Sequence, residues 1–166
     1  KIPYLTYLGQ DEYQGGYQAG LRMAAEGGTG AVCINQQVGH AGLDKRCKGF
    51  LDAMAEKDIP AEVLAISDDP AESTTTIGDY YAANPETNIF LTLGPNGASP
   101  FYAFVENEGL TADDFKHGTF DLGDEINANI KSGVTMFGID QQPFLQGYGG
   151  IQALQLLVRR GVVPAL

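Results

Sequence analysis

The chain has 166 residues, of which 43% are hydrophobic and 19% charged, as is typical of one globular domain. Its net charge of −11 argues against nucleic acid or an anionic membrane surface as a partner, because binding to either concentrates Lys and Arg. No apolar stretch approaches the roughly 20 residues of a spanning helix, and no charged-then-apolar leader opens the sequence. We therefore expect a soluble chain without direct membrane insertion which, if exported, is already processed or is an excised piece.

Apolar runs alternate with stretches of helical periodicity along the chain. Strands are predicted at 2–8, 31–35, 62–66, 88–93, 118–122 and 134–139. Helices are predicted at 13–24, 43–56, 70–83, 100–109, 123–132 and 151–158. This alternation predicts an α/β fold, a three-layer Rossmann-like sandwich with a mostly parallel six-stranded sheet.

The segment 33–50 is where the sequence is most informative. An apolar run ends at a polar, glycine-containing loop, and the helix that follows carries Arg46 about one turn in. Such a helix directs its N-terminus and Arg46 at the carboxyl edge of the sheet, where open α/β sheets bind small ligands. An exposed position on the helix is the alternative for Arg46.

Amides and carboxylates follow nearly every predicted strand. They are Gln10, Asp11, Asn35, Gln36, Asp68, Asp69, Asn96, Asp121, Asp124, Asp140, Gln141 and Gln142, joined by Gly94, Pro95 and His40. Together with Arg46, these planar groups suit the vicinal hydroxyls of a sugar or polyol better than a phosphate or a hydrophobic ligand. Singly, several have a plainer interpretation: Asp69 can be a helix cap, and His40 a surface residue of its loop.

Motifs of the common enzymes are missing from the sequence. It contains no phosphate cradle, no dinucleotide fingerprint after the first strand and no nucleophile elbow, so we expect neither a cofactor nor catalysis. The two cysteines, Cys33 and Cys47, form either a disulfide or two buried thiols. A metal site is not expected, because His117 lies far from His40 and the cysteines in sequence.

Four segments, in order, resemble periplasmic sugar-binding proteins of the ribose/galactose type, the solute receptors of ABC transporters. They are the Arg-x-x-Gly-Phe pattern at 46–50, LGPNGA at 93–98, TFD at 119–121 and FGIDQQP at 137–143. The resemblance implies two α/β lobes that close on a sugar about a hinge. It also implies a periplasmic or extracellular bacterial location and a membrane permease as partner.

By position, the resemblance assigns sugar binding to three places. Arg46 and Asp121 match binding residues, and Asp140 or Gln141 matches the polar ligand near the hinge. Gly94 stands where many relatives have a binding Asn, so backbone groups of this loop or Asn96 must contribute instead.

The resemblance covers one lobe only. Residues 1–139 correspond to the C-terminal-type sugar-binding lobe, and residues 140–166 to the hinge crossing and a helix that would pack on the absent N-terminal lobe. Without that lobe, we expect the helix at 145–160 to fold back, to pair with a second copy of the chain or to be poorly ordered.

Two alternatives to a transporter receptor remain. One is the effector-binding domain of a LacI-type transcription regulator, since such cores resemble the same receptors. The other is a sugar-processing enzyme on a similar sheet, with Asp121 or His40 as its base. A disulfide between Cys33 and Cys47 would favour export.

Overall fold

The computed structural model describes residues 5–162, which divide into two compact units. The larger unit is Asp11–Asp140, and the smaller consists of residues 5–10 together with residues 141–162. Along the chain the elements are α1 (Glu12–Ala25), β1 (Ala31–Asn35), α2 (Ala41–Ala55), β2 (Ala61–Ala65), α3 (Pro70–Ala83), β3 (Ile89–Thr92), α4 (Pro95–Glu108), β4 (Lys116–Phe120), α5 (Asp124–Ser132), β5 (Phe137–Ile139) and α6 (Pro143–Arg160).

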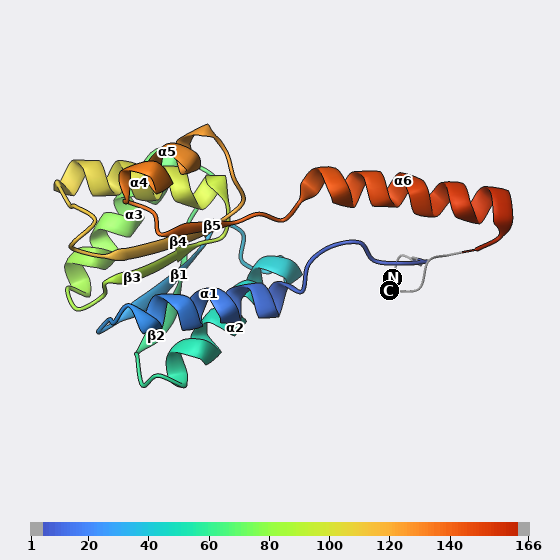
Figure 1. The fold of residues 1–166 in the computed structure, drawn as a ribbon. Helices are drawn as coiled ribbons and strands as arrows, with labels where there is room; N and C mark the ends of the chain where they lie inside the picture. The colour runs from blue at the N-terminus through green and yellow to red at the C-terminus, as the bar shows by residue number, and fades with distance from the viewer. Residues whose placement is uncertain (1–4, 163–166) are drawn as a thin grey trace. The chain divides into compact units, whose positions relative to one another are not determined.

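The larger unit is built on a five-stranded sheet in the order β2-β1-β3-β4-β5, and all four pairings are parallel (Figure 1). β1 and β3 lie inside the sheet and are buried along their whole length, which explains their continuous apolar sequences. β2 is an edge strand and is largely exposed. The parallel α/β architecture predicted from the sequence is confirmed.

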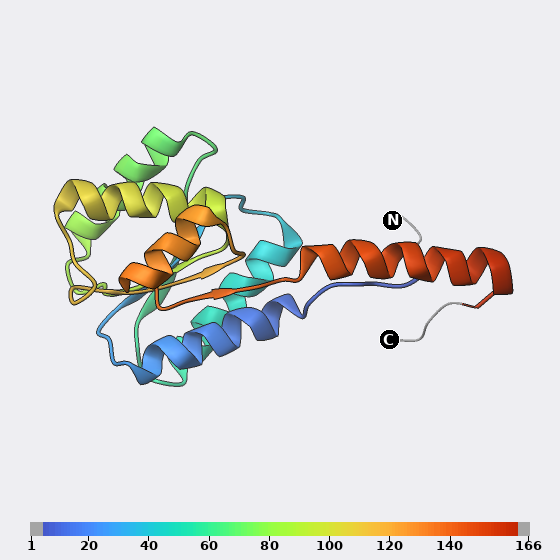
Figure 2. The same cartoon turned by 45° about the horizontal axis from the view of Figure 1, so that its top comes forward.

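Two helical layers cover the sheet, one on each face (Figure 2). α1 and α2 bury Met23, Phe50 and Met54 against one face. α3, α4 and α5 cover the other, where aromatic side chains dominate: the rings of Phe90 and Phe101 lie 5.2 Å apart. This is the three-layer sandwich that the alternating pattern implies.

The sheet has five strands rather than six, because residues 5–8 form no strand. A strand needs a neighbouring strand with which to form a hydrogen-bonded ladder. Residues 5–8 belong to the smaller unit, and α6 is the only helix or strand among the described residues of that unit, so it contains no strand with which they could pair. Residues 2–4 of the predicted strand lie outside the described residues.

The start of α4 also differs from the prediction. The helix begins at Pro95, not Pro100, so the predicted loop at 94–97 is mostly its first turn. Pro95 occupies the first helical position, which proline tolerates because no intrahelical N–H partner is needed there. Pro100 lies inside the helix, a position that the sequence pattern disfavours.

The smaller unit consists of residues 5–10 beside the 18-residue helix α6 (Figure 1). Leu5, Leu8, Ala153, Leu154 and Leu157 line a groove of about 390 Å³ within it. Most of the other apolar side chains of α6 are exposed, including Phe144, Tyr148, Ile151 and Val158. The helix is well formed, so a disordered segment here is not what the structure shows.

Candidate functional site

The carboxyl ends of the parallel strands meet at one edge of the sheet. β1 ends at Asn35 and is followed by Gln36, β3 leads to Gly94, β4 is followed by Asp121, and β5 by Asp140. Since β1, β3, β4 and β5 are consecutive neighbours in the sheet, these positions lie side by side along that edge. This is the edge at which open α/β sheets bind ligands.

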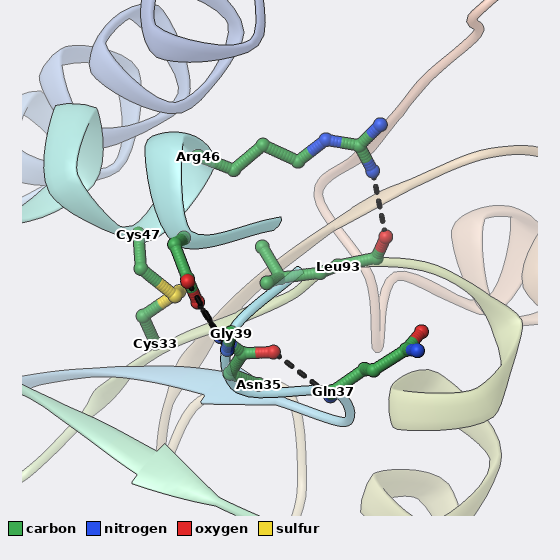
Figure 3. The surroundings of a disulfide bond; sticks show 8 residues. Cys33, Asn35, Gln37, Gly39, Arg46, Cys47 and Leu93 are labelled. Carbon is green, nitrogen blue, oxygen red and sulfur yellow. Dashed lines mark hydrogen bonds between the residues drawn. A yellow bond between two sulfur atoms is a disulfide. The ribbon is translucent and has the colours of Figure 1, made fainter. Parts of the chain in front are cut away.

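Arg46 is a buried cation fixed at this edge. Its Nε donates to Oε2 of Glu12 at 2.6 Å. Its Nη1 donates to the carbonyl oxygen of Leu93 at 2.9 Å, the bond drawn in Figure 3. Its guanidinium carbon lies 4.2 Å from the ring centroid of Phe120. The residue is 5% exposed, so the alternative of an exposed helix position is wrong. The contacts hold the guanidinium at the ends of β3 and β4.

The close crossing of α1 and α2 makes these contacts of Arg46 possible. A Cβ on Gly16 of α1 would collide with the carbonyl oxygen of Arg46, and one on Gly49 of α2 would collide with that of Tyr13. Glycine at both positions therefore lets the two backbones touch, which brings Glu12 within reach of Arg46. The Arg-x-x-Gly spacing in α2 thus serves one packing arrangement.

A disulfide between Cys33 and Cys47 joins the interior of β1 to α2, with Cα atoms 5.6 Å apart (Figure 3). Both residues are buried, and neither cysteine is a free thiol. Cys47 directly follows Arg46, so the crosslink fixes the turn of α2 that carries the arginine.

Asn35 and Asp44 shape the loop between β1 and α2. The buried Asn35 donates from Nδ2 to Asp44 at 3.0 Å and accepts at Oδ1 from the backbone N–H of Gln37 at 2.9 Å. Asp44 also accepts from the backbone N–H of Gly39, while His40 caps α2 and is exposed. Asn35, the last residue of β1, therefore holds the loop through its buried side chain.

Gly94, Gln36 and Asp121 converge on one point of the edge. A Cβ built on Gly94 would lie 3.4 Å from Oδ2 of Asp121 and 3.7 Å from Nε2 of Gln36. Gly94 has φ 157°, a value that L residues rarely adopt. The missing side chain at Gly94 thus leaves a space bordered by a carboxylate and an amide.

Asp121 has a left-handed backbone, with φ 65°, and its N–H donates to the carbonyl oxygen of Ile139 at 2.8 Å. This bond joins the ends of β4 and β5. A non-glycine residue at positive φ costs conformational energy and often marks a functional position. Asp140 follows β5 directly and is exposed.

Three other residues are predicted for the site from the sequence. Asn96 is exposed in the first turn of α4. Asp69 caps α3 by accepting from the N–H groups of Ala71 and Glu72, both at 2.9 Å, after the edge strand β2. Gln141 belongs to the smaller unit, where its carbonyl accepts from Nε2 of Gln146.

A buried polar network connects β3 and β4 with the residues before β5. His117 hydrogen-bonds Thr92 at 3.0 Å through Nε2 and Thr135 at 2.9 Å through Nδ1, and Thr92 donates to Thr119 at 2.8 Å. The ring of Phe101 stacks on His117 with centroids 4.2 Å apart. Burial lowers the pKa of His117 to about 3, so the imidazole is neutral at pH 7.

Two contributors could not be assigned from the sequence. Glu12 reads only as a favourable charge at a helix start, and its partner Arg46 is 34 residues away. Gln36 was one amide among many along the edge, and only its position beside Gly94 distinguishes it.

In the part of the chain that the structure describes, no helix is long and apolar enough to cross a bilayer. Within the same residues, no three His, Cys, Asp or Glu side chains gather in a way that could hold a metal ion.

Solved structures similar to this one are sugar receptors. A periplasmic sugar-binding protein of an ABC sugar transporter from Legionella pneumophila superposes with a TM-score of 0.90 at 28% identity, over 98% of this chain and 61% of that one. A carbohydrate transporter from Acidothermus cellulolyticus, in complex with myo-inositol, gives 0.87 at 30% identity over 97% of this chain and 55% of that one.

Sequence comparison points the same way. The xylose/arabinose-binding protein of Sulfolobus acidocaldarius is 24% identical over 152 residues, which are 88% of this chain and 38% of that protein. The chain thus spans between 38% and 61% of the length of these relatives. The family described as the periplasmic binding protein domain matches residues 1–161. With this match and a parallel α/β lobe of the same architecture, the chain belongs to the periplasmic binding protein family.

Proposed function

We propose that this chain is part of the substrate-binding component of a sugar ABC transporter and binds a monosaccharide or polyol without chemical turnover. The observation that carries the proposal is the fixed guanidinium of Arg46 beside Gly94 and the left-handed Asp121 at one sheet edge. A charged fork and a carboxylate held in place can exchange hydrogen bonds with neighbouring hydroxyl groups.

In this proposal Arg46 and Asp121 are the principal ligand-binding side chains, and Gly94 leaves room for the ligand. Asp140, Gln141 and Asn96 are further candidates. Asp69 is the weakest, because its carboxylate already caps α3.

Residues 1–139 would then form the C-terminal-type lobe, with residues 140–166 as the hinge crossing and a helix for the second lobe. The large exposed side chains of α6, such as Ile151 and Val158, suit a helix that packs on a further domain. The ligand would bind between two lobes, so one lobe alone should bind it weakly or not at all.

The Cys33–Cys47 disulfide supports an exported receptor rather than a cytoplasmic transcription regulator, because such bonds persist in oxidising compartments. A periplasmic or extracellular location and a membrane permease as partner complete the proposal.

Calorimetric titration of the full-length, two-lobed protein tests this function. The panel should contain pentoses, hexoses and polyols, and include xylose, arabinose and myo-inositol because relatives are named for them or were solved with them. We expect saturable binding of at least one member. NMR spectra of that sugar after incubation with the protein should show it chemically unchanged. Absence of binding across the panel, or turnover of a bound sugar, would contradict the proposal.

A further inference from the structure

The side chain of Gln36 carries a buried polar atom that the fold leaves unpaired. Its Oε1 is the one buried side-chain oxygen or nitrogen of the described residues that has no hydrogen-bond partner. A Cβ on Gly97 would lie 3.3 Å from this oxygen, so the amide rests against the first turn of α4. Because burying an unpaired polar atom is unfavourable, this oxygen contributes no hydrogen bond to the stability of the fold.

The other end of the same amide borders the space above Gly94. Nε2 of Gln36 and Oδ2 of Asp121 are the two atoms of the described residues, beyond the chain neighbours of Gly94, within 4 Å of a Cβ position there. A ligand atom that approaches Gly94 from this side therefore has one hydrogen-bond donor and one acceptor beside it.

A hydroxyl group matches such a pair, since its oxygen can accept from the amide while its proton is donated to the carboxylate. An ether, carbonyl or carboxylate oxygen has no proton for Asp121, and an ammonium group cannot accept from Gln36. The arrangement therefore selects for a neutral hydroxyl at this position.

We propose that Gln36 is a specificity-determining residue which, together with Asp121, holds one hydroxyl of the ligand in the space left by Gly94. This inference rests on the proposed sugar-binding function and deepens it. The ligand class is a sugar or polyol with a free hydroxyl at that position.

Gln36→Met in the full-length protein removes the amide while keeping the length of the side chain. The matched control is Gln37→Met, because Gln37 is the exposed neighbour whose bond to Asn35 involves only its backbone. With the panel sugar that the unaltered protein binds best, we expect Gln36→Met to weaken binding about tenfold or more and Gln37→Met to leave it unchanged. The melting temperature of ligand-free Gln36→Met should stay the same or rise, since an unpaired buried oxygen is gone.

Monodeoxy derivatives of that sugar complete a double-mutant cycle. The unaltered protein and Gln36→Met should bind one of these derivatives with equal affinity. The hydroxyl missing from that derivative is then the one that Gln36 contacts. Equal affinity of Gln36→Met and the unaltered protein for the parent sugar would overturn the inference while leaving the proposed function intact. If the unaltered protein binds no member of the panel, both fall together.

Discussion

Arg46 is a single buried cation that connects three elements far apart in the sequence. Through Glu12, Leu93 and Phe120 it joins the start of α1 to the ends of β3 and β4. A buried charge with such partners has little freedom to turn, and a ligand does not have to immobilise it on binding. The same contacts imply that the residue supports the stability of the fold, in addition to the binding role that we propose for it.

Arg46→Ala should lower the free energy of unfolding of the lobe by about 1.5–3 kcal/mol, because Glu12 loses its charged donor. It should weaken sugar binding by a similar amount in the full-length protein. The double variant Arg46→Met with Glu12→Gln is the control, since it removes both charges. We expect urea unfolding to show recovered stability in the double variant and calorimetry to show binding still impaired. Recovery of binding there would remove Arg46 from the ligand site.

Because of His117, the free energy of unfolding depends on pH between about pH 3 and pH 6.5. In the unfolded chain the imidazole takes up a proton below about pH 6.5, whereas the folded site resists protonation down to about pH 3. The unfolded state therefore binds more protons in that window, and stability falls as the pH falls, by about 1.4 kcal/mol per unit from this group.

Urea unfolding at pH 7 and pH 5, compared between the unaltered chain and His117→Gln, isolates this contribution from that of the carboxylates. The unaltered chain should lose about 2 kcal/mol more than the variant over this interval. Equal losses would mean that His117 is protonated in the folded protein at pH 5.

At the scale of elements, α1 and α2 cross with their backbones in contact, through Gly16 and Gly49. This crossing determines whether Glu12 reaches Arg46, so the position of the guanidinium depends on how closely the two helices pack. Elsewhere in the lobe, glycine is less constrained: a Cβ on Gly78 of α3 would meet Phe104 at an ordinary 3.8 Å.

Gly49→Ala should therefore destabilise the lobe by about 1–3 kcal/mol, because the new methyl group forces the two helices apart. Gly78→Ala, also within a helix, should stabilise it by about 0.5–1 kcal/mol by reducing the entropy of the unfolded chain. Thermal or urea unfolding of both variants and of the unaltered chain measures these two changes in stability. A harmless alanine at position 49 would mean that the crossing is looser than described.

Local signals in the sequence were sufficient for the caps and most of the strands. Asp69 and Pro70 predicted the start of α3 correctly, and apolar runs located β1 and β3. The start of α4 was missed because two prolines five residues apart in the chain, Pro95 and Pro100, resemble a loop. Contacts such as Arg46 with Glu12 depend on tertiary packing across 34 residues, which no local pattern encodes.

At the scale of the whole molecule, one unit holds the sheet and the other exposes an apolar helix. Phe144 is 79% and Val158 83% exposed on α6. Burying such a side chain contributes roughly 1.5–3 kcal/mol, so a large exposed stripe favours association.

Chain 1–166 alone should thus form concentration-dependent dimers or larger species in size-exclusion chromatography with light scattering. Replacing Ile151 and Val158 by Glu should give a monomer, whereas Gln152→Glu with Gln155→Glu, the same added charge on exposed polar positions of α6, should not. A monomer at every concentration of the unaltered chain would contradict this expectation.

The crosslink between β1 and α2 has a practical consequence for anyone who produces this protein. Its bond closes a loop of 15 residues, for which the entropic contribution to stability is about 3 kcal/mol. Cytoplasmic expression in a reducing host would deliver thiols in place of the bond, next to the arginine that we propose binds the ligand. Affinities measured on such batches would vary with their degree of oxidation, and a thiol assay before each titration would separate a poor ligand from a poor preparation.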